Sequence, residues 1–145
     1  MNYFIFIITN QSGIGRGLYS ERQFLDLMEW VKCRFVEKDI VIEKIYFCPH
    51  HKDAVIKEYR RDCESRKPRP GMINSAANQF NLNLHKSVLI GDKLSDIDAG
   101  YAAGIRHNFL LTQGGECHFA SKDFRRVSTF DEIIQYFSLS TKPSI

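Results

Sequence analysis

The order of apolar and polar segments is the feature that most constrains the fold of this chain. The first apolar run, Tyr3–Ile8, is continuous and made of β-branched and aromatic residues, which is typical of a strand buried on both faces. The run ends in a polar, glycine-rich loop over Thr9–Gly17. Ser20 then begins a helix, and Gln23 completes a capping-box pattern three residues later. The apolar stripe predicted for this helix consists of Phe24, Met28, Val31 and Phe35.

The alternation of strand and helix continues through the rest of the chain. Further strands are predicted over Val41–Phe47, Ser87–Ile90 and Asn108–Leu111, with a weaker one around Arg126–Val127. Helices are predicted after Pro70-Gly71, over Asp96–Ala103 with Gly104 as its stop, and over Asp131–Phe137. Strands that alternate with helices indicate a parallel, Rossmann-like α/β sheet. The length of 145 residues suits one domain, so we expect a single domain over residues 1–145.

Composition excludes several other classes of protein. A hydrophobic fraction of 43% and a charged fraction of 26% supply a core and argue against intrinsic disorder. A formal charge of only +3, without a recognised nucleic-acid module, gives no reason to expect nucleic acid as a partner. We expect no membrane span, because the first apolar run is too short, and no signal peptide, because no basic segment precedes that run and no small-residue cleavage site follows it. Four irregularly spaced cysteines predict a cytoplasmic protein with reduced thiols, in which Cys33 and Cys117-His118 are structural or incidental. A monomer is the default expectation.

Polar side chains follow three of the predicted strands. Thr9 follows the first, Cys48 the second and Asp92 the third. Ligands collect at the carboxyl ends of parallel strands, so we expect these positions to meet at one site. The hydroxyls, amides and flexible backbone of the segment Thr9–Gly13 can hold phosphoryl oxygens. An ordinary strand-to-helix turn uses the same residue types, and neither the dinucleotide fingerprint nor a P-loop is present.

Carboxylates and cations are concentrated in two further segments. Asp92, with Asp96 and Asp98 close behind it, offers the oxygen ligands that Mg²⁺ prefers. Capping of the following helix by Asp96 is the alternative interpretation. The segment Arg66–Pro70 carries three cations in four positions, a composition suited to a phosphorylated substrate. A solvated basic loop or a nucleic-acid patch would have the same composition.

Residues 48–70 show no regular periodicity and contain a near-complete zinc-binding pattern. Cys48 and His50 form one short pair of soft ligands, and Cys63 begins a second pair in which Ser65 is a poor ligand. A loop with free thiols and no metal is the alternative. The fourth ligand would come from His51, Asp62 or water.

Taken together, these motifs resemble one family. They resemble the haloacid-dehalogenase (HAD) superfamily, specifically the D-glycero-D-manno-heptose 1,7-bisphosphate phosphatases and the related histidinol phosphatases. The resemblance extends from Ile7 to about Leu111. The segments that carry it are Thr9–Gly17, Cys48–His51, Cys63–Pro68, Pro70–Met72 and Gly91–Gly100.

The resemblance implies a Mg²⁺-dependent phosphomonoesterase that removes the 7-phosphate of the heptose bisphosphate, for lipopolysaccharide or capsule synthesis. In that family an aspartate attacks phosphorus to form an aspartyl-phosphate, and a second aspartate protonates the leaving oxygen and then activates water. By resemblance, Thr9 holds the phosphoryl group, Lys67 neutralises its charge and Asp92 binds Mg²⁺. Cys48, His50 and Cys63 bind a structural Zn²⁺. The implied substrate contacts are Asn10, Gln11, Ser12, Arg66 and Lys93.

The chain departs from the family in two places. Ser65 stands where the family has its fourth zinc-binding cysteine, and no Asp-x-Asp-Gly motif occurs in the 145 residues. In the superfamily that motif lies on a central strand between the strands that end at Thr9 and Asp92. We therefore expect a missing central strand, two unpaired strand edges, a cleft, poor solubility and no activity as written. The alternative is a non-catalytic remnant, or a phosphosugar-binding fragment that needs a partner chain.

Overall fold

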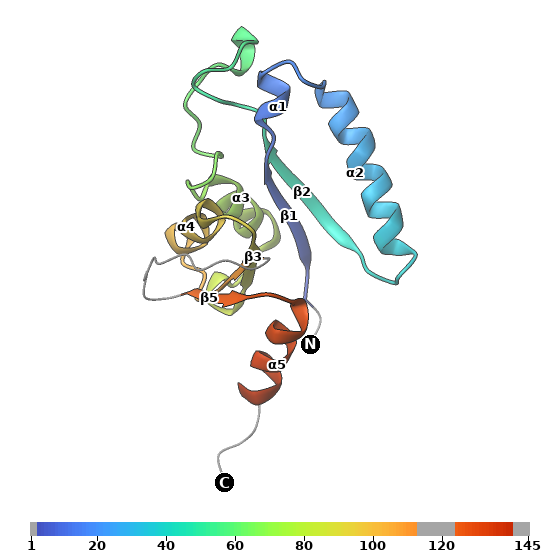
Figure 1. Cartoon of the computed structure of the whole chain (residues 1–145), viewed down its shortest axis with the longest axis vertical. Coiled ribbons are helices and arrows are strands. Elements are labelled where there is room, and N and C mark those ends of the chain that lie inside the picture. The colour runs from blue at the N-terminus through green and yellow to red at the C-terminus, as the bar shows by residue number, and fades with distance from the viewer. Residues whose placement is uncertain (1–2, 113–123, 141–145) are drawn as a thin grey trace.

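A computed structural model describes residues 3–112 and 124–140, and it shows five parallel strands in two separate sheets (Figure 1). Strands β1 (Ile5–Asn10) and β2 (Ile42–Cys48) form a two-stranded sheet. The second sheet has three strands in the order β3-β4-β5. Its strands are β3 (Val88–Gly91), β4 (His107–Leu111) and β5 (Phe124–Val127). The predicted parallel α/β class is confirmed.

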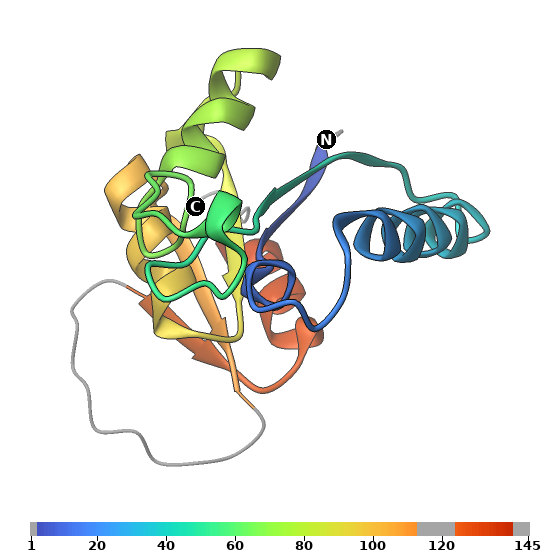
Figure 2. The same ribbon diagram turned by 90° about the horizontal axis from the view of Figure 1, so that it is seen from above.

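The helices lie between these strands in the chain. The five helices of the described residues are α1 (Ser12–Gly15), α2 (Glu21–Val36), α3 (Gly71–Phe80), α4 (Leu94–Ala103) and α5 (Phe130–Ser140). Two 3-10 turns cover Lys57–Tyr59 and Leu84–Lys86. Seen from above, α2 lies on one side of the β1–β2 pair, whereas α3 and α4 lie on the other (Figure 2). None of the helices in the described part of the chain is long and apolar enough to cross a bilayer.

Local signals in the sequence account for the ends of two helices. The Ser20 hydroxyl accepts a hydrogen bond from the Gln23 backbone N–H, and the Gln23 side chain accepts one from the Ser20 N–H. The capping box predicted for α2 is therefore present. Gly104 ends α4 with a φ of +87°, which an L-residue with a side chain adopts only with strain. Helix α1 was not predicted, because its four residues lie inside a polar segment typical of a loop.

Helix α3 connects the two sheets through a shared apolar cluster. Ile73 of α3 packs with Ala99 and Ile105 in the core of this cluster. Ile8 of β1 and Leu89 of β3 pack against the same cluster from the two sides. The two sheets are thus held side by side by a helix, without hydrogen bonds between β1 and β3.

A cleft separates β1 from β3. Within the described residues, β1 pairs only with β2 and β3 pairs only with β4. The cleft between them has a volume of about 1060 Å³. It is lined mainly by apolar side chains, among them Phe4, Phe6, Ile8, Leu89, Ile90 and Ile134. Lys67 and Asp96 also line it, so the space reaches the carboxyl ends of both strands. The gap expected between these two strands is present.

Two expectations about burial are wrong. The first strand is not buried on both faces, since Ile5 is 41% exposed and Phe4 is 62% exposed. Both residues line the cleft, where no strand of the described residues covers them. In α2 the predicted stripe is buried at Phe24, but Phe35 is 40% exposed because β1 and β2 offer only two strands for the helix to pack on.

Candidate active site

The carboxyl end of β1 carries a chain of side-chain hydrogen bonds. Thr9 and Asn10 are the last two residues of the strand and are both half-buried. The Gln11 backbone N–H donates to the Cys48 carbonyl at 2.8 Å, which ties the end of β1 to the end of β2. The Gln11 side-chain nitrogen Nε2 donates to the Thr9 hydroxyl at 3.0 Å. The Tyr19 hydroxyl donates to the Gln11 side-chain oxygen Oε1 at 2.6 Å.

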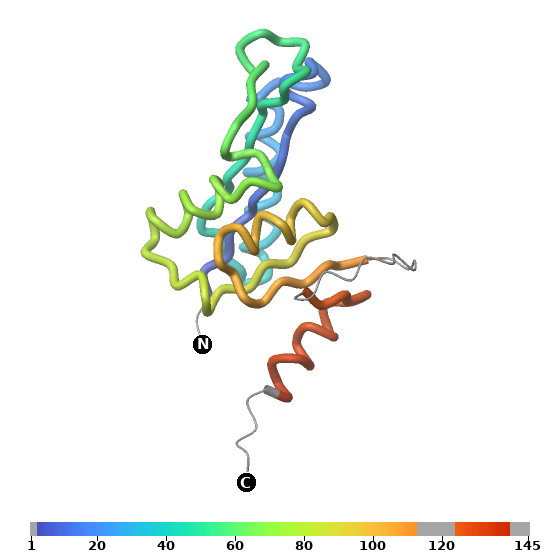
Figure 3. Tube along the Cα trace, turned by 90° about the vertical axis from the view of Figure 1, so that its left-hand side faces the viewer, coloured from blue at the N-terminus to red at the C-terminus, as the bar shows by residue number. Residues whose placement is uncertain are grey.

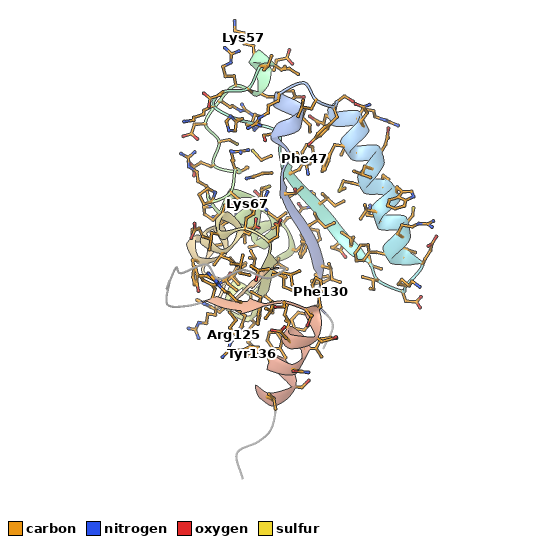
Figure 4. All side chains as sticks on the ribbon, viewed as in Figure 1. Phe47, Lys57, Lys67, Arg125, Phe130 and Tyr136 are labelled. Carbon is orange, nitrogen blue, oxygen red and sulfur yellow. The ribbon has the colours of Figure 1, made fainter. Side chains whose placement is uncertain are left out.

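Lys67 is held at the same end of the sheet from several directions. Its backbone N–H and carbonyl are both bound by the Asn10 side-chain amide, at 3.0 and 3.1 Å. Its ammonium nitrogen Nζ donates to the Ile8 carbonyl at 2.8 Å and pairs with Asp96 Oδ1 at 2.5 Å. Figure 4 shows Lys67 beside β1, on the side toward α3 and α4. Two of the three ammonium N–H donors are used in this way, which leaves one for a ligand.

Asp96 has a double structural role. Its other carboxylate oxygen accepts a hydrogen bond from the Lys93 backbone N–H at 3.0 Å, in the first turn of α4. The predicted capping role and the ion pair with Lys67 are therefore both present. The side chains of Lys67 and Asp96 are only 13% and 7% exposed, so this is a buried charge pair that requires both partners.

The carboxylates predicted to form a magnesium cluster do not gather in one place. Asp96 is buried against Lys67, whereas Asp92 and Asp98 are exposed. Asp92 follows the last residue of β3, at the strand end where it was expected. Lys93 is exposed beside it. Asp92 is thus the accessible one of the two carboxylates nearest this strand end, and a carboxylate of this kind could supply one oxygen ligand to Mg²⁺.

The predicted zinc ligands lie together in the irregular segment. Ligand atoms of Cys48, His50 and Cys63 are all within 4.8 Å of one another, and Cys48 Sγ lies 3.6 Å from His50 Nδ1. Burial lowers the pKa of His50, with a further contribution from the Arg61 guanidinium, and favours the neutral imidazole that binds metals. Burial, followed by the neighbouring Cys63, raises the pKa of Cys48 to about 11. Binding of a metal would therefore release a proton from this thiol.

The candidates for a fourth protein ligand lie elsewhere. His51 Nδ1 accepts a hydrogen bond from the Asp53 backbone N–H at 3.1 Å, and the Asp62 carboxylate binds Arg69 at 2.5 Å. Neither side chain joins the cluster of three ligands. Cys33 is exposed on α2, and Cys117-His118 lies outside the described residues. Within the described residues, the group of candidate metal ligands therefore consists of Cys48, His50 and Cys63.

Adding a fourth protein ligand at position 65 is expected to strengthen zinc binding. Ser65→Cys places a thiolate two residues after Cys63, which completes two short ligand pairs. We expect its affinity for Zn²⁺ to rise by at least about tenfold, because a fourth soft ligand replaces water. Competition with a chromogenic chelator measures this affinity. Cys33→Ser is the control and should change nothing, and an unchanged affinity in Ser65→Cys would contradict a zinc site at Cys48, His50 and Cys63 with position 65 beside it.

Sequence reasoning missed two contacts of the site. Tyr19 was not predicted to belong to the site, because it stands between the predicted glycine-rich loop and the helix that begins at Ser20. Asp96 was interpreted only as a carboxylate or a cap, since nothing local connects it to Lys67. Asn10 was predicted to contact substrate, and its amide is engaged with the Lys67 backbone. Of the remaining predicted substrate residues, Gln11 and Ser12 directly follow β1 and Lys93 follows β3. Arg66 is half-buried and donates to the His50 carbonyl at 3.1 Å.

Sequence comparisons identify relatives of the chain. A family model described as HAD-hydrolase-like matches residues 64–126. A D-glycero-beta-D-manno-heptose-1,7-bisphosphate 7-phosphatase from Yersinia pestis is 41% identical over 114 residues, covering 79% of this chain and 61% of that protein. The corresponding alpha phosphatase of Photorhabdus laumondii is 46% identical over 114 residues, covering 79% of this chain and 62% of that protein. The chain thus spans about three fifths of the length of these relatives.

Solved structures share the fold. A protein described as a HAD-like phosphatase from Mesorhizobium loti has a TM-score of 0.81 and 28% identity over 93% of this chain and 64% of its own. The D,D-heptose 1,7-bisphosphate phosphatase of B. bronchiseptica, complexed with magnesium and phosphate, has a TM-score of 0.77 and 24% identity over 95% of this chain and 75% of its own.

The parallel α/β fold and the family model that matches residues 64–126 are those of HAD-like proteins, and the chain is similar to members of that superfamily. The resemblance inferred from its motifs is thereby confirmed. Its sequence relatives within the superfamily are the heptose 1,7-bisphosphate 7-phosphatases.

Proposed function

We propose that this chain forms the phosphate-binding and magnesium-binding part of a phosphomonoesterase that removes the 7-phosphate from D-glycero-D-manno-heptose 1,7-bisphosphate. The observation that carries the proposal is the arrangement of Lys67. Asn10 holds the Lys67 backbone, and the Ile8 carbonyl and the Asp96 carboxylate hold its ammonium group beside the carboxyl end of β1, near Thr9. Homology to the heptose phosphatases supports the choice of substrate.

Each proposed residue has a role that follows from its chemistry. The Thr9 hydroxyl donates a hydrogen bond to the phosphoryl group, and the third N–H of the Lys67 ammonium neutralises the charge of that group. Asn10 acts through Lys67, whose backbone it holds. The side chains proposed to contact the rest of the substrate are Gln11, Ser12, Arg66 and Lys93.

Asp92 would hold Mg²⁺ at the end of β3. When bound, the ion would neutralise charge on the phosphoryl oxygens. Cys48, His50 and Cys63 would hold a structural Zn²⁺ that keeps residues 48–63 folded beside the site. We further propose a cytoplasmic monomer that serves lipopolysaccharide or capsule synthesis and has neither nucleic acid nor a membrane as a partner.

The part of the chain that the structure describes provides no Asp-x-Asp-Gly nucleophile at the site. Asp96-Ile97-Asp98 is its one Asp-x-Asp sequence, and Ala99 follows in place of glycine. Asp96 is buried in its pair with Lys67, and Asp98 is exposed. We therefore propose that the chain by itself does not turn over substrate, and that catalysis needs a strand bearing Asp-x-Asp-Gly in the cleft between β1 and β3.

The cleft favours a second candidate function, a phosphosugar-binding fragment that needs a partner chain. A strand between β1 and β3 would satisfy the backbone edges of both and bury the apolar side chains that line the space. The partner in this case is a separate polypeptide with the same motif. The two candidates differ in whether the strand must be joined covalently to the chain.

The test is phosphate release from both anomers of heptose 1,7-bisphosphate, with Mg²⁺. We expect none from the 145-residue chain, and release from a fusion that adds a strand, loop and helix with Asp-x-Asp-Gly before Tyr3. In the fusion, replacement of the first aspartate of the added motif by asparagine should abolish release. Activity in the unmodified chain would contradict the proposal. Activity restored by the same segment as a separate peptide would favour the partner-chain function.

A further inference from the structure

Tyr19 stands at the start of the hydrogen-bond chain that ends on Thr9. Its hydroxyl donates to Gln11 Oε1 at 2.6 Å, and Gln11 Nε2 donates to Thr9 Oγ1 at 3.0 Å. All three side chains are half-buried, so water competes only partly for these bonds. The site described above uses Thr9 and Gln11, but gives no role to Tyr19.

The direction of these two hydrogen bonds determines whether the Thr9 hydroxyl can donate a hydrogen bond to a ligand. A side-chain amide has a donor end and an acceptor end, so a phenol that donates to Oε1 directs the amide N–H groups toward Thr9. Thr9 Oγ1 then accepts a hydrogen bond from Gln11, and the hydroxyl proton must point elsewhere. In the opposite orientation Thr9 would donate to Gln11 Oε1, and its only proton would be lost to a ligand. With the phenol as the donor to Gln11 Oε1, as in this structure, the Thr9 O–H stays available as a donor.

Packing fixes the phenol in this position. A Cβ atom built on Gly13 would lie 2.3 Å from Cε1 of the Tyr19 ring, so the ring rests directly against the bare backbone of α1. The Leu18 backbone N–H donates to the Gly13 carbonyl at 2.9 Å, which folds the segment before Tyr19 back over α1. On its other side, Ser20 is fixed by the capping box of α2. Tyr19 is thus anchored independently of the residues that it orients.

We propose that Tyr19 is a positioning residue, which acts through Gln11 to present the Thr9 hydroxyl as a hydrogen-bond donor to a tetrahedral oxyanion such as phosphate. The identity of the anion rests on the proposed function, whereas the relay from Tyr19 to Thr9 does not. A phenylalanine at position 19 keeps the ring against Gly13 but lets the Gln11 amide turn over. In the turned orientation the Thr9 hydroxyl would donate its hydrogen bond to Gln11 Oε1, and it would be unable to donate to a ligand.

A double-mutant cycle on the whole chain tests the relay. Dissociation constants for inorganic phosphate with Mg²⁺ are measured for the wild type, Tyr19→Phe, Thr9→Val and the double mutant. We expect Tyr19→Phe to weaken binding about three- to tenfold and Thr9→Val about tenfold or more, as for the loss of one hydrogen bond to a charged group. The double mutant should bind no more weakly than Thr9→Val alone, because both changes remove the same interaction.

A second measurement needs no ligand. In NMR spectra, the side-chain amide signals of Gln11 should shift in Tyr19→Phe and stay unchanged in the matched control Tyr59→Phe. The control removes a hydroxyl that donates to Glu21 at 3.2 Å, outside the site. Additive losses in the cycle, or unchanged Gln11 signals in Tyr19→Phe, would overturn the relay and leave the phosphate site intact. Absence of phosphate binding in the wild type would overturn the proposed function together with the role of the relay in it.

Discussion

Lys67→Met is expected to lower the free energy of unfolding by about 3–5 kcal/mol, because it leaves the Asp96 carboxylate buried without its partner. The Asp96 side chain is only 7% exposed, so water cannot replace the lost ammonium group. Methionine keeps most of the length of the side chain, and little of the loss comes from a cavity. Urea denaturation followed by circular dichroism measures the change.

Two further variants separate charge from packing in this experiment. Arg22→Met removes an exposed cation from its pair with Asp26 on α2, and should cost no more than about 0.5 kcal/mol. Adding Asp96→Asn to Lys67→Met removes the buried carboxylate that has lost its partner. The double mutant should therefore recover a large part of the lost stability. A loss below about 1 kcal/mol in Lys67→Met would show that the pair is not buried in the way described.

Gly91→Ala is expected to cost about 2–4 kcal/mol and to weaken phosphate binding. A Cβ at Gly91 would lie 2.3 Å from the Asp96 Cβ and 2.7 Å from its Oδ2. Because Asp96 belongs to the first turn of α4, its Cβ cannot withdraw without moving the helix. The clash therefore displaces the carboxylate that anchors Lys67. Urea denaturation and phosphate titration of the same samples measure the two effects.

Gly104→Ala is the matched control for Gly91→Ala. Gly104 has a φ of +87° and no atom within 4 Å of its ideal Cβ position, so alanine there suffers backbone strain without a clash. We expect a cost of about 1–2 kcal/mol and an unchanged affinity for phosphate. Equal phosphate affinities for Gly91→Ala and the wild type would show that the position of Asp96 does not matter to the site.

The sequence predicted well those parts of the fold that are encoded locally. Periodicity located the strands, and the helices other than α1, to within a few residues, and the Ser20–Gln23 capping box needs only residues three apart. The pattern around Cys48, His50 and Cys63 was also recognisable, because metal ligands come in short pairs.

Contacts between distant segments could not be predicted from local patterns. Asn10 and Lys67 are 57 positions apart, and nothing near either residue indicates that one holds the backbone of the other. The burial of β1 was overestimated for a related reason, since its apolar residues are typical of a strand with neighbours on both sides. The resemblance, rather than the apolar pattern, predicted that one neighbour would be missing.

The arrangement of the chain in space gives the cleft a mechanical consequence. Figure 3 shows α1 and the irregular segment 49–70 at one end of the molecule and α5 at the other. Between these ends, the β1–β2 pair is joined to the β3–β4–β5 sheet chiefly through α3, with which both β1 and α4 are in contact.

In an ordinary parallel sheet, the amide hydrogens of the central strands are protected from exchange, and those of the edge strands exchange more quickly. Here the order is reversed, because the two strand edges that face the cleft have no partner in the described residues, whereas β4 is bonded on both sides. Amide hydrogens of β1 and β3 that point into the cleft should exchange with solvent quickly, and those of β4 slowly. We therefore expect the most labile backbone of the described residues to lie in the centre of the fold, where α3 connects the two halves.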